Sequence, residues 1–321
     1  MDVIALGEIL IDFSEIDTNS EGYPTLAANP GGAPANFLTP IAKYGLKAAM
    51  IGKVGNDTFG KLLVNTLKKN KIDTKNVIVD DSVFTTLAFV TNDASGERDF
   101  SFARKPGGDT KLKYEEIDLS LIDKSKVFHF GTLSLTNNPS KDTTKKIVNY
   151  AKKINKLISF DPNIRKPLWS NLEDAKKAMV YGLNKADIVK ISDEEVEFLF
   201  NTKDKDASSF LLNKFKNIKL LYVTCGSKGA NYATRRYFGF VKALNNIKVI
   251  DTTGAGDIFG GSAMYKFLKL NKDINDLTNE DLIDIVKFAT ISAGLSTTKQ
   301  GGISSVVDIE TINDNLSKNY I

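Results

Sequence analysis

The chain has 321 residues, 42% of them hydrophobic, and its 43 lysines and arginines against 39 aspartates and glutamates give a formal net charge of +4. This hydrophobic content supports a substantial core, but no apolar run approaches the roughly 20 residues of a membrane span, so we expect no contact with a membrane. The lysines are scattered rather than clustered with arginines and aromatics, which argues against a nucleic-acid partner.

The first apolar stretch lies between Asp2 and Glu8, with no basic residue before it. This pattern is typical of a buried strand and not of a signal peptide. Cys225 is the single cysteine, so no intrachain disulfide can form. We therefore expect a reducing, cytoplasmic location.

Short apolar runs alternate with longer amphipathic stretches along most of the chain. The short runs predict strands at residues 3–6, 49–54, 127–130, 157–160, 188–191 and 220–224. The amphipathic stretches predict helices at residues 59–70, 141–153, 173–184, 257–270 and 279–298. Because the two alternate, we expect an α/β fold in which a Rossmann-like parallel sheet carries helices on both faces.

Residues 85–91 and 99–104 interrupt this rhythm, because they are rich in β-forming residues and the residues between them have turn chemistry. They predict an antiparallel hairpin whose partner strands come from residues 12–29. A small sheet of this kind could be a lid, spanning about residues 12–30 and 84–106, although an ordinary edge hairpin has the same pattern. Phe89, Phe100 and Phe102 could give it an apolar face, so we expect a homodimer through the lid.

Gly31 and Gly32 precede a helix that is expected to start near Ala35. Glycines let a ligand approach the backbone, and the amide of Asn36 offers both a donor and an acceptor. This combination suits a polyol, although a tight turn before a helix would give the same pattern.

Four charged residues follow predicted strands, namely Asp12, Arg104, Asp161 and Arg165. Because ligands of open α/β sheets bind at the carboxyl ends of strands, we expect these groups to gather at one edge. Asp12 could accept hydrogen bonds from two neighbouring sugar hydroxyls, and Arg165 could contact a phosphoryl group or a hydroxyl. Each of them alone could also be a surface charge.

The most informative stretch runs from Asp251 to Asp257, with the sequence D-T-T-G-A-G-D, at the predicted start of a helix. The N–H groups of a first helical turn are unpaired and can point at an anion, and glycines let the anion come close. A carboxylate at the mouth of such a pocket is well placed to accept a proton from an attacking alcohol. The stretch therefore predicts phosphoryl transfer to a hydroxyl, with Asp257 as the general base.

A glycine-spaced loop at residues 224–229 follows another predicted strand and could hold nucleotide phosphates. The chain has no G-x-x-x-x-G-K-[ST] and no G-x-G-x-x-G after its first strand, which excludes a P-loop and opposes a nicotinamide dehydrogenase. His129 is the single histidine, so a histidine-based triad or a His-rich metal site is hard to build.

Taken together, these motifs resemble the ribokinase (PfkB) family of carbohydrate kinases, and within it the fructokinases, over nearly the whole chain. Residues 31–36 with 52–60 are similar to the N-terminal family signature, and residues 251–261 to the C-terminal one. Residues 102–109 are similar to the fructokinase F-Y-R-x-P-G-A-D, and residues 161–169 to D-P-N-x-R-x-x-L-W. The resemblance implies a single ribokinase-like domain over residues 1–321 with a β-sheet lid, and transfer of the ATP γ-phosphate to a primary sugar hydroxyl, with D-fructose giving fructose 6-phosphate.

The resemblance also implies roles for individual residues. The catalytic set would be Asp257 as base, Arg165, and an anion hole of Gly254, Ala255 and Gly256. The sugar ligands would be Asp12, Gly31, Gly32, Asn36, Arg104 and Asp161. The nucleotide contacts would be Lys190, Thr224, Gly226, Gly229, Ala289 and Ser292. Glu195 would hold Mg²⁺ through water, and K⁺ would lie, mostly against backbone, near Asp251, Thr253, Ser296, Lys299, Gly301 and Ser305.

Two positions depart from the family pattern. Ser192 replaces the asparagine of an N-x-x-E motif linked to magnesium, and Ala103 stands where fructokinases usually carry tyrosine. The identity of the sugar substrate is therefore open. The alternative within the same chemistry is a 2-keto-3-deoxygluconate kinase. A non-catalytic sugar-binding protein on the same scaffold is the alternative from another class, and the intact Asp257 argues against it.

Overall fold

The computed structural model describes residues 1–92, 98–201 and 207–319. Within these ranges the main feature is a nine-stranded sheet with the order β13-β12-β11-β10-β9-β8-β1-β4-β5. Its strands are β1 (Val3–Leu6), β4 (Ala48–Gly55), β5 (Ile72–Asp80), β8 (Val127–Phe130), β9 (Leu157–Phe160), β10 (Ile188–Ser192), β11 (Leu220–Thr224), β12 (Gly229–Ala233) and β13 (Phe238–Lys242). The strands from β5 to β11 pair in parallel, and β12 and β13 extend one edge antiparallel.

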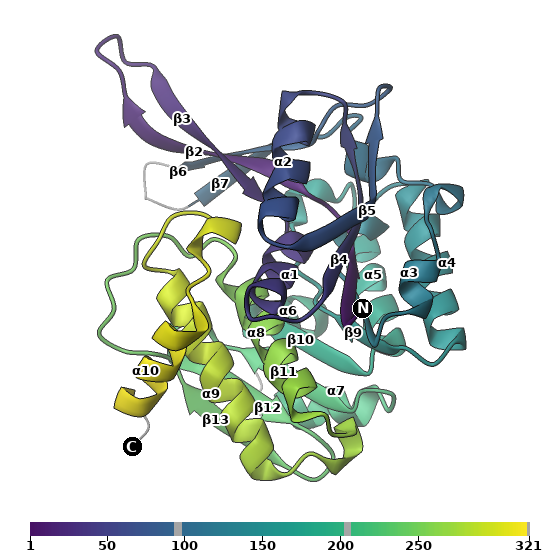
Figure 1. The fold of residues 1–321 in the computed structure, drawn as a ribbon, viewed down its shortest axis with the longest axis vertical. Coiled ribbons are helices and arrows are strands. Elements are labelled where there is room, and N and C mark those ends of the chain that lie inside the picture. The colour runs from purple at the N-terminus through teal and green to yellow at the C-terminus, as the bar shows by residue number, and fades with distance from the viewer. Residues whose placement is uncertain (93–97, 202–206, 320–321) are drawn as a thin grey trace.

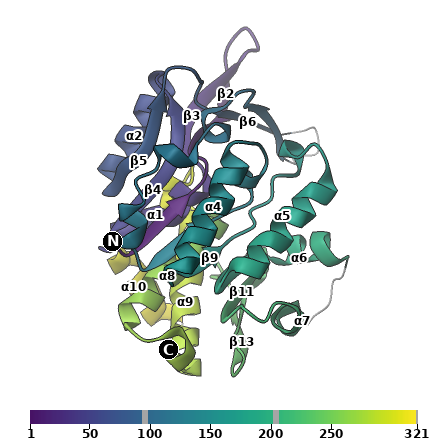
Figure 2. The ribbon, with the colours of Figure 1, turned by 90° about the vertical axis from the view of Figure 1, so that its right-hand side faces the viewer.

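Helices cover both faces of this sheet (Figures 1 and 2). One face carries α1 (Ala33–Lys43), α2 (Thr58–Lys69), α8 (Ala255–Leu270) and α9 (Asn279–Ser296), with α10 (Ile309–Asn319) packed on α9. The other carries α3 (Ser120–Asp123), α4 (Ser140–Lys153), α5 (Leu172–Lys185), α6 (Asp193–Phe200) and α7 (Ala207–Lys214). This confirms the predicted α/β class.

Strand β1 shows why the apolar runs form a two-sided sheet. Val3 and Ala5 point into the core on one face, and Ile4 and Leu6 point into the core on the other. Successive strand residues point to opposite faces, so a continuous apolar run can be buried only where both faces are covered. All four residues are fully buried.

A second, four-stranded sheet with the order β3-β2-β6-β7 stands beside the main one within the described ranges (Figure 1). It consists of β2 (Leu10–Thr18), β3 (Pro24–Gly31), β6 (Leu87–Asn92) and β7 (Arg98–Ala103). The predicted hairpin and its partner strands are thus confirmed, while the turn at residues 93–97 lies outside the described residues. One expectation was wrong: Asp12 does not follow a strand of the main sheet, because β2 begins at Leu10 and places Asp12 inside the small sheet, opposite Asn29.

Three strands of the main sheet, β5, β12 and β13, had no counterpart in the prediction. Their apolar patterns are weaker because they lie at or near the two edges, where solvent reaches one side. On β13, for example, Phe238 is 82% exposed. Among the described residues, none of the helices is both long enough and apolar enough to cross a membrane.

Candidate active site

A cavity of about 990 Å³ lies at the carboxyl ends of the central strands, and we call it the Asp257 cavity. The small sheet contributes Val90 and Phe102 to its wall. It collects nine of the predicted site residues, which come from five separate stretches of chain: Asp12, Gly32, Asn36, Arg165, Lys190, Glu195, Thr253, Gly254 and Asp257. Of the four charged groups expected to gather at one edge, Asp12 and Arg165 line this cavity, whereas Arg104 and Asp161 do not.

Asp257 lies in the first turn of α8 and is 6% exposed. Its Oδ2 atom accepts a hydrogen bond of 3.0 Å from the amide of Asn36, and its Oδ1 atom accepts one of 2.9 Å from the amide of Asn163. Burial raises the pKa of Asp257, and the positive charge of Lys190 opposes that shift. Two neutral amides thus fix the orientation of a carboxylate that faces an open cavity.

The start of α8 is shaped to receive an anion. Gly254 precedes the helix in the left-handed conformation, with φ of 74°, and no side chain caps the helix. A Cβ atom at Gly254 would lie 2.9 Å from the Asn36 amide nitrogen, and one at Gly256 would lie 3.0 Å from the Lys190 ammonium. Side chains are therefore kept out of the space in front of the first-turn N–H groups, which carry the positive end of the helix dipole.

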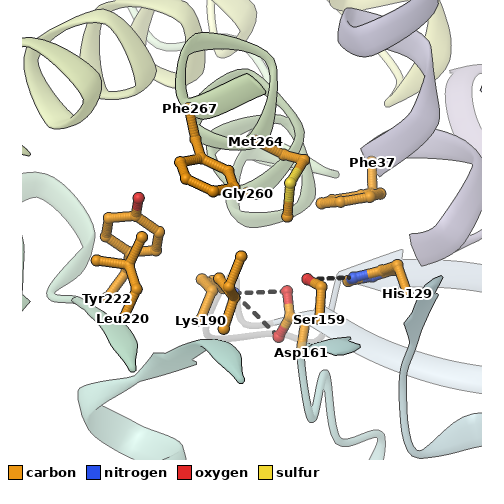
Figure 3. A pocket seen from close by; sticks show the side chains of 11 residues that line it. Phe37, His129, Ser159, Asp161, Lys190, Leu220, Tyr222, Gly260, Met264 and Phe267 are labelled. Atoms are coloured by element: carbon orange, nitrogen blue, oxygen red, sulfur yellow. Dashed lines mark hydrogen bonds and ion pairs between the residues drawn. The ribbon is translucent and has the colours of Figure 1, made fainter. Parts of the chain in front are cut away.

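A buried ion pair between Lys190 and Asp161 lies near the start of α8 (Figure 3). The Lys190 ammonium is 3.1 Å from the nearer carboxylate oxygen of Asp161, and both side chains are almost fully buried. Burial lowers the pKa of Lys190, but Asp161 and the other nearby carboxylates raise it overall, so the ammonium stays charged. Asp161 lies outside the Asp257 cavity and acts here as the partner of Lys190.

The single histidine of the sequence lines the same small pocket as this ion pair (Figure 3). Nδ1 of His129 is 2.9 Å from the Ser159 hydroxyl, and the imidazole ring stacks on Phe37 with a centroid distance of 3.7 Å. Burial lowers the pKa of His129 to about 3, so the ring is neutral near pH 7. His129 is thus a packed residue of β8, as its sequence context indicated.

Glu195 and Ser192 form a capping box at the start of α6. The Ser192 hydroxyl accepts a hydrogen bond from the Glu195 N–H, and Glu195 Oε2 accepts one from the Ser192 N–H. Glu195 Oε1 accepts a 2.9 Å bond from the N–H of Ile164, next to Arg165. Ser192 therefore caps α6, a position that serine and asparagine fill about equally well.

The predicted cation positions come from adjoining loops. Asp251 Oδ1 accepts a bond from the Thr253 N–H, and Asp251 Oδ2 accepts one of 2.8 Å from the Gly301 N–H. The N–H of Lys299 donates to the carbonyl of Ser296. The hydroxyls of Ser296 and Ser305 are buried and donate to backbone carbonyls.

Arg104 was expected to hold the sugar, but the structure buries it elsewhere. Its guanidinium forms a 2.5 Å ion pair with Asp109 and does not line the Asp257 cavity. Instead it borders a neighbouring cavity of about 600 Å³, together with Phe102 and Trp169. Arg104 is therefore not a free cation that awaits a substrate in this structure.

Two of the predicted nucleotide contacts, Ala289 and Ser292, do not border the Asp257 cavity. Ala289 and Ser292 are fully buried on the side of α9 that packs against the core. The Ser292 hydroxyl lies 3.0 Å from the Tyr44 hydroxyl and 2.8 Å from the Ser262 hydroxyl. Neither residue presents a surface to a ligand. The small residues of an amphipathic helix do not by themselves show which of its faces is exposed, so the sequence alone could not reveal this.

The remaining predicted residues have mixed settings. Thr224 ends β11 beside Ser192, and Gly226 is exposed in the turn that follows. Gly229 is buried, and a Cβ atom there would collide with the Val241 carbonyl, so its glycine has a packing reason. A Cβ atom at Gly31 would collide with the Asp12 carboxylate, which shows how closely the glycine pair approaches that side chain.

The site also contains two residues without a predicted role, Asn163 and Glu8. Asn163 adopts φ of 42°, donates to Asp257 and accepts a bond from Arg165. Asparagine is one of the few non-glycine residues that adopt the left-handed conformation readily. An asparagine directly after a strand could therefore have suggested a special turn at this position. Glu8 is 4% exposed, accepts the Ala33 N–H at 2.9 Å, and lines the Asp257 cavity.

Comparison with known proteins agrees with this geometry. Residues 1–309 match the pfkB family of carbohydrate kinases. The chain is 37% identical to probable fructokinase-3 of Arabidopsis thaliana, over 97% of this chain and 90% of that one. It is 38% identical to fructokinase-2 of Solanum lycopersicum, over 95% and 92%.

Solved structures agree as well. A fructokinase from Xylella fastidiosa with bound ATP superimposes with a TM-score of 0.90 at 28% identity, covering 99% of both chains. A fructokinase from Vibrio cholerae O395 with fructose, ADP and calcium bound has a TM-score of 0.86 at 31% identity, covering 98% of both. From its sequence, its fold and the residues gathered around Asp257, this chain belongs to the pfkB family and is a sugar kinase.

Proposed function

We propose that this chain transfers the γ-phosphate of ATP to the primary hydroxyl of D-fructose and forms fructose 6-phosphate. The observation that carries the proposal is the Asp257 carboxylate, held between the amides of Asn36 and Asn163 at the uncapped start of α8. Relatives named as fructokinases, at 37–38% identity over most of the chain, support the choice of sugar.

The residues around Asp257 divide into two groups by chemistry. Asp12, Gly32 and Asn36 offer carboxylate acceptors, a backbone without a side chain and an amide, which suit the hydroxyls of a sugar. Arg165 and the first-turn N–H groups of α8 offer positive charge and donors, which suit a transferring phosphoryl group. Asp257 lies between the two groups and accepts the hydroxyl proton as the bond to phosphorus forms.

The nucleotide would lie along the ends of β10 and β11, where Lys190, Thr224 and Gly226 are found. Among the described residues no three His, Cys, Asp or Glu side chains are close enough to hold a metal ion by themselves. This fits Mg²⁺, which keeps several waters and binds through few carboxylates plus substrate phosphates. Glu195 lines the cavity and would hold it through water; when bound, Mg²⁺ neutralises charge on the phosphates.

A monovalent cation would be held by the loops at Asp251 and Gly301, which the Asp251 carboxylate ties together. A Vibrio cholerae fructokinase structure contains a potassium ion together with fructose and ADP, which supports K⁺ as the cation. The small sheet would close over the sugar, and its outer strands would form the homodimer contact. The expected cellular location is the cytoplasm.

The direct test is a panel of sugars with ATP and Mg²⁺, assayed by ADP release. We expect turnover with D-fructose, stimulated when potassium replaces sodium in the buffer. Turnover with 2-keto-3-deoxygluconate but not fructose would move the assignment to the alternative kinase. Sugar binding by calorimetry with no ADP release for any sugar would instead favour a non-catalytic protein.

A further inference from the structure

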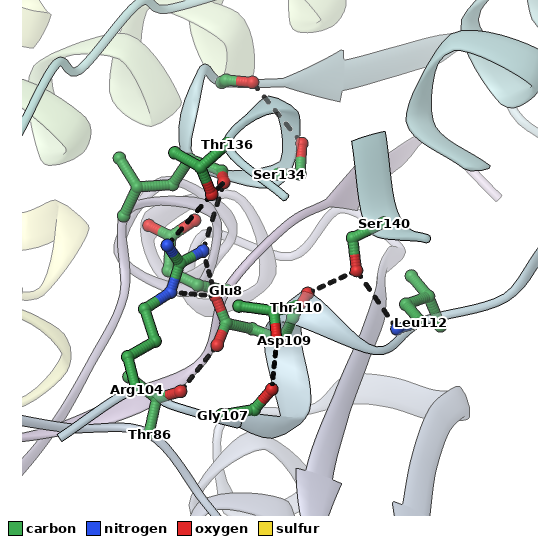
Figure 4. A network of polar contacts seen from close by, with 12 residues as sticks. Glu8, Thr86, Arg104, Gly107, Asp109, Thr110, Leu112, Ser134, Thr136 and Ser140 are labelled. Atoms are coloured by element: carbon green, nitrogen blue, oxygen red, sulfur yellow. Dashed lines mark hydrogen bonds and ion pairs between the residues drawn. The ribbon is translucent and has the colours of Figure 1, made fainter. Parts of the chain in front are cut away.

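Asp109 ends the Gly107-Gly108-Asp109 stretch, which has no part in the proposed function so far. Its side chain is buried, and both of its carboxylate oxygens are occupied (Figure 4). Oδ2 accepts bonds from Arg104 Nε at 2.8 Å and from Arg104 Nη2 at 2.5 Å, and Oδ1 accepts one from the Thr86 hydroxyl at 2.5 Å.

These two partners stand at the bases of two neighbouring strands of the small sheet. Thr86 immediately precedes β6, which starts at Leu87, and Arg104 immediately follows β7, which ends at Ala103. A single buried carboxylate therefore joins both ends of the hairpin where it leaves the main body. Charge-assisted bonds of this kind are about twice as strong as neutral ones.

The same cluster is fixed to the main body. Arg104 also donates to the Leu133 carbonyl at 3.1 Å and to the Thr136 hydroxyl at 2.9 Å, so four hydrogen bonds hold its guanidinium. The Asp109 carbonyl accepts a 2.6 Å bond from the Ser140 hydroxyl at the start of α4. The hairpin base is therefore anchored to the body on more than one side.

The two anchored strands, β6 and β7, form part of the wall of the Asp257 cavity. Val90 lies on β6 and Phe102 on β7, within four residues of Thr86 and two of Arg104, and both line the Asp257 cavity. A shift at the hairpin base would move these side chains relative to Asn163 and Asp257, which belong to the main body and line the same cavity. We propose that Asp109 is a positioning residue for sugar binding, which acts through Thr86 and Arg104 to set how the small sheet covers the cavity; this inference rests on the proposed function.

The test compares three variants by calorimetry with D-fructose and by steady-state kinetics. Asp109→Asn removes the charge, while Thr86→Val removes only the hydroxyl and leaves the ion pair intact. Asp187→Asn is the matched control, because Asp187 also holds an ion pair, with Lys219, and a backbone N–H, from Ile158, but at the far end of the sheet. All three are followed by thermal unfolding.

We expect Asp109→Asn to raise the Kd and KM for fructose about tenfold and Thr86→Val about threefold, from the loss of a charged and of a single hydrogen bond. The KM for ATP should stay within about twofold in both, and Asp187→Asn should lower only thermal stability. Wild-type fructose affinity in Thr86→Val, or in a folded Asp109→Asn, would overturn the positioning role. An equal rise of both KM values would do so too.

Buried ion pairs are costly to break, so Asp109→Asn could fail to fold, and Thr86→Val then decides alone. The two proposals fail differently. If the wild-type enzyme neither binds nor phosphorylates fructose, the proposed function fails and this inference fails with it. If the wild type does both and the variants keep its fructose affinity, only the role of Asp109 is lost.

Discussion

At the scale of single residues, the site depends on amides and carboxylates that hold one another. Asn163 illustrates this, because it donates to Asp257 and accepts from Arg165. It therefore fixes the distance between the proposed base and the proposed phosphoryl ligand. Displacing reacting groups by about 1 Å can cost a hundredfold in rate.

Replacing Asn163 by alanine should accordingly lower kcat by about a hundredfold, with a smaller change in the KM for sugar. Steady-state kinetics would measure both. Asn184→Ala serves as the control, because Asn184 is exposed on α5 and bonds only within that helix among the described residues. Full activity in Asn163→Ala would show that Asp257 does not need this amide.

Glu8 makes the folded protein sensitive to pH. Burial raises its pKa to about 7, against about 4.3 for a free glutamate. Between these values the folded state holds a proton that the unfolded state has lost, so the stability due to Glu8 is present at low pH and falls as pH rises towards 7.

Glu8→Gln should remove this dependence. In urea unfolding we expect the variant to gain on the order of 2 kcal/mol relative to wild type between about pH 5 and about pH 8. The comparison of the two proteins cancels the contribution of all other titrating groups. Parallel pH profiles would mean that the Glu8 carboxyl is solvated in the folded protein.

At the scale of elements, α8 begins after a glycine in the left-handed conformation, and no side chain caps it. By contrast, Thr278 and Asp281 form a full capping box at the start of α9. Glycine at an N-cap costs only about a few tenths of a kcal/mol relative to a capping side chain, so this helix start can stay open for a ligand with little loss of stability.

Gly254→Ala should lower the free energy of unfolding by about 1–2 kcal/mol, because alanine is strained at positive φ, and it should also displace the Asn36 amide. Gly256→Ala is the matched variant, since its new methyl would meet only the flexible tip of Lys190. Thermal unfolding should therefore show a clearly lower Tm for Gly254→Ala than for Gly256→Ala. Equal Tm values would contradict the strain argument.

At the scale of the whole molecule, the exposed apolar residues indicate where a second copy would pack. Ile16, Tyr23 and Leu26, at the outer end of β2 and β3, are 52%, 64% and 36% exposed. Phe89, which was expected at this face, is instead stacked on Phe13 with a centroid distance of 5.3 Å, and the side chain of Phe100 lies outside those described.

We therefore expect a dimer in sedimentation at micromolar concentration, and expect Ile16→Lys to shift it to the monomer by placing a charge in the apolar contact. A matched change on β13, an edge strand of the main sheet, is Phe238→Lys, which should leave the dimer intact. A monomeric mass for the wild-type protein would exclude the lid contact.

The sequence predicted the α/β class, the central strands and the hairpin, because period-two and helical patterns are local. It also pointed to Asp257 and Gly254, which line the Asp257 cavity, while their catalytic roles stay predictions. It could not show that Arg104 pairs with Asp109, nor that Ser292 faces Tyr44, since such contacts depend on which surfaces pack together. Edge strands such as β13 were missed for the same reason.

We propose that Asp257 accepts the proton of an attacking sugar hydroxyl, and the kinetics of an Asp257→Asn variant test this role. We predict a kcat about two to four decades below wild type, with calorimetric affinities for fructose and ATP largely unchanged, because asparagine keeps the shape but not the basicity. Turnover close to wild type in a variant that binds both substrates would show that Asp257 is not the general base.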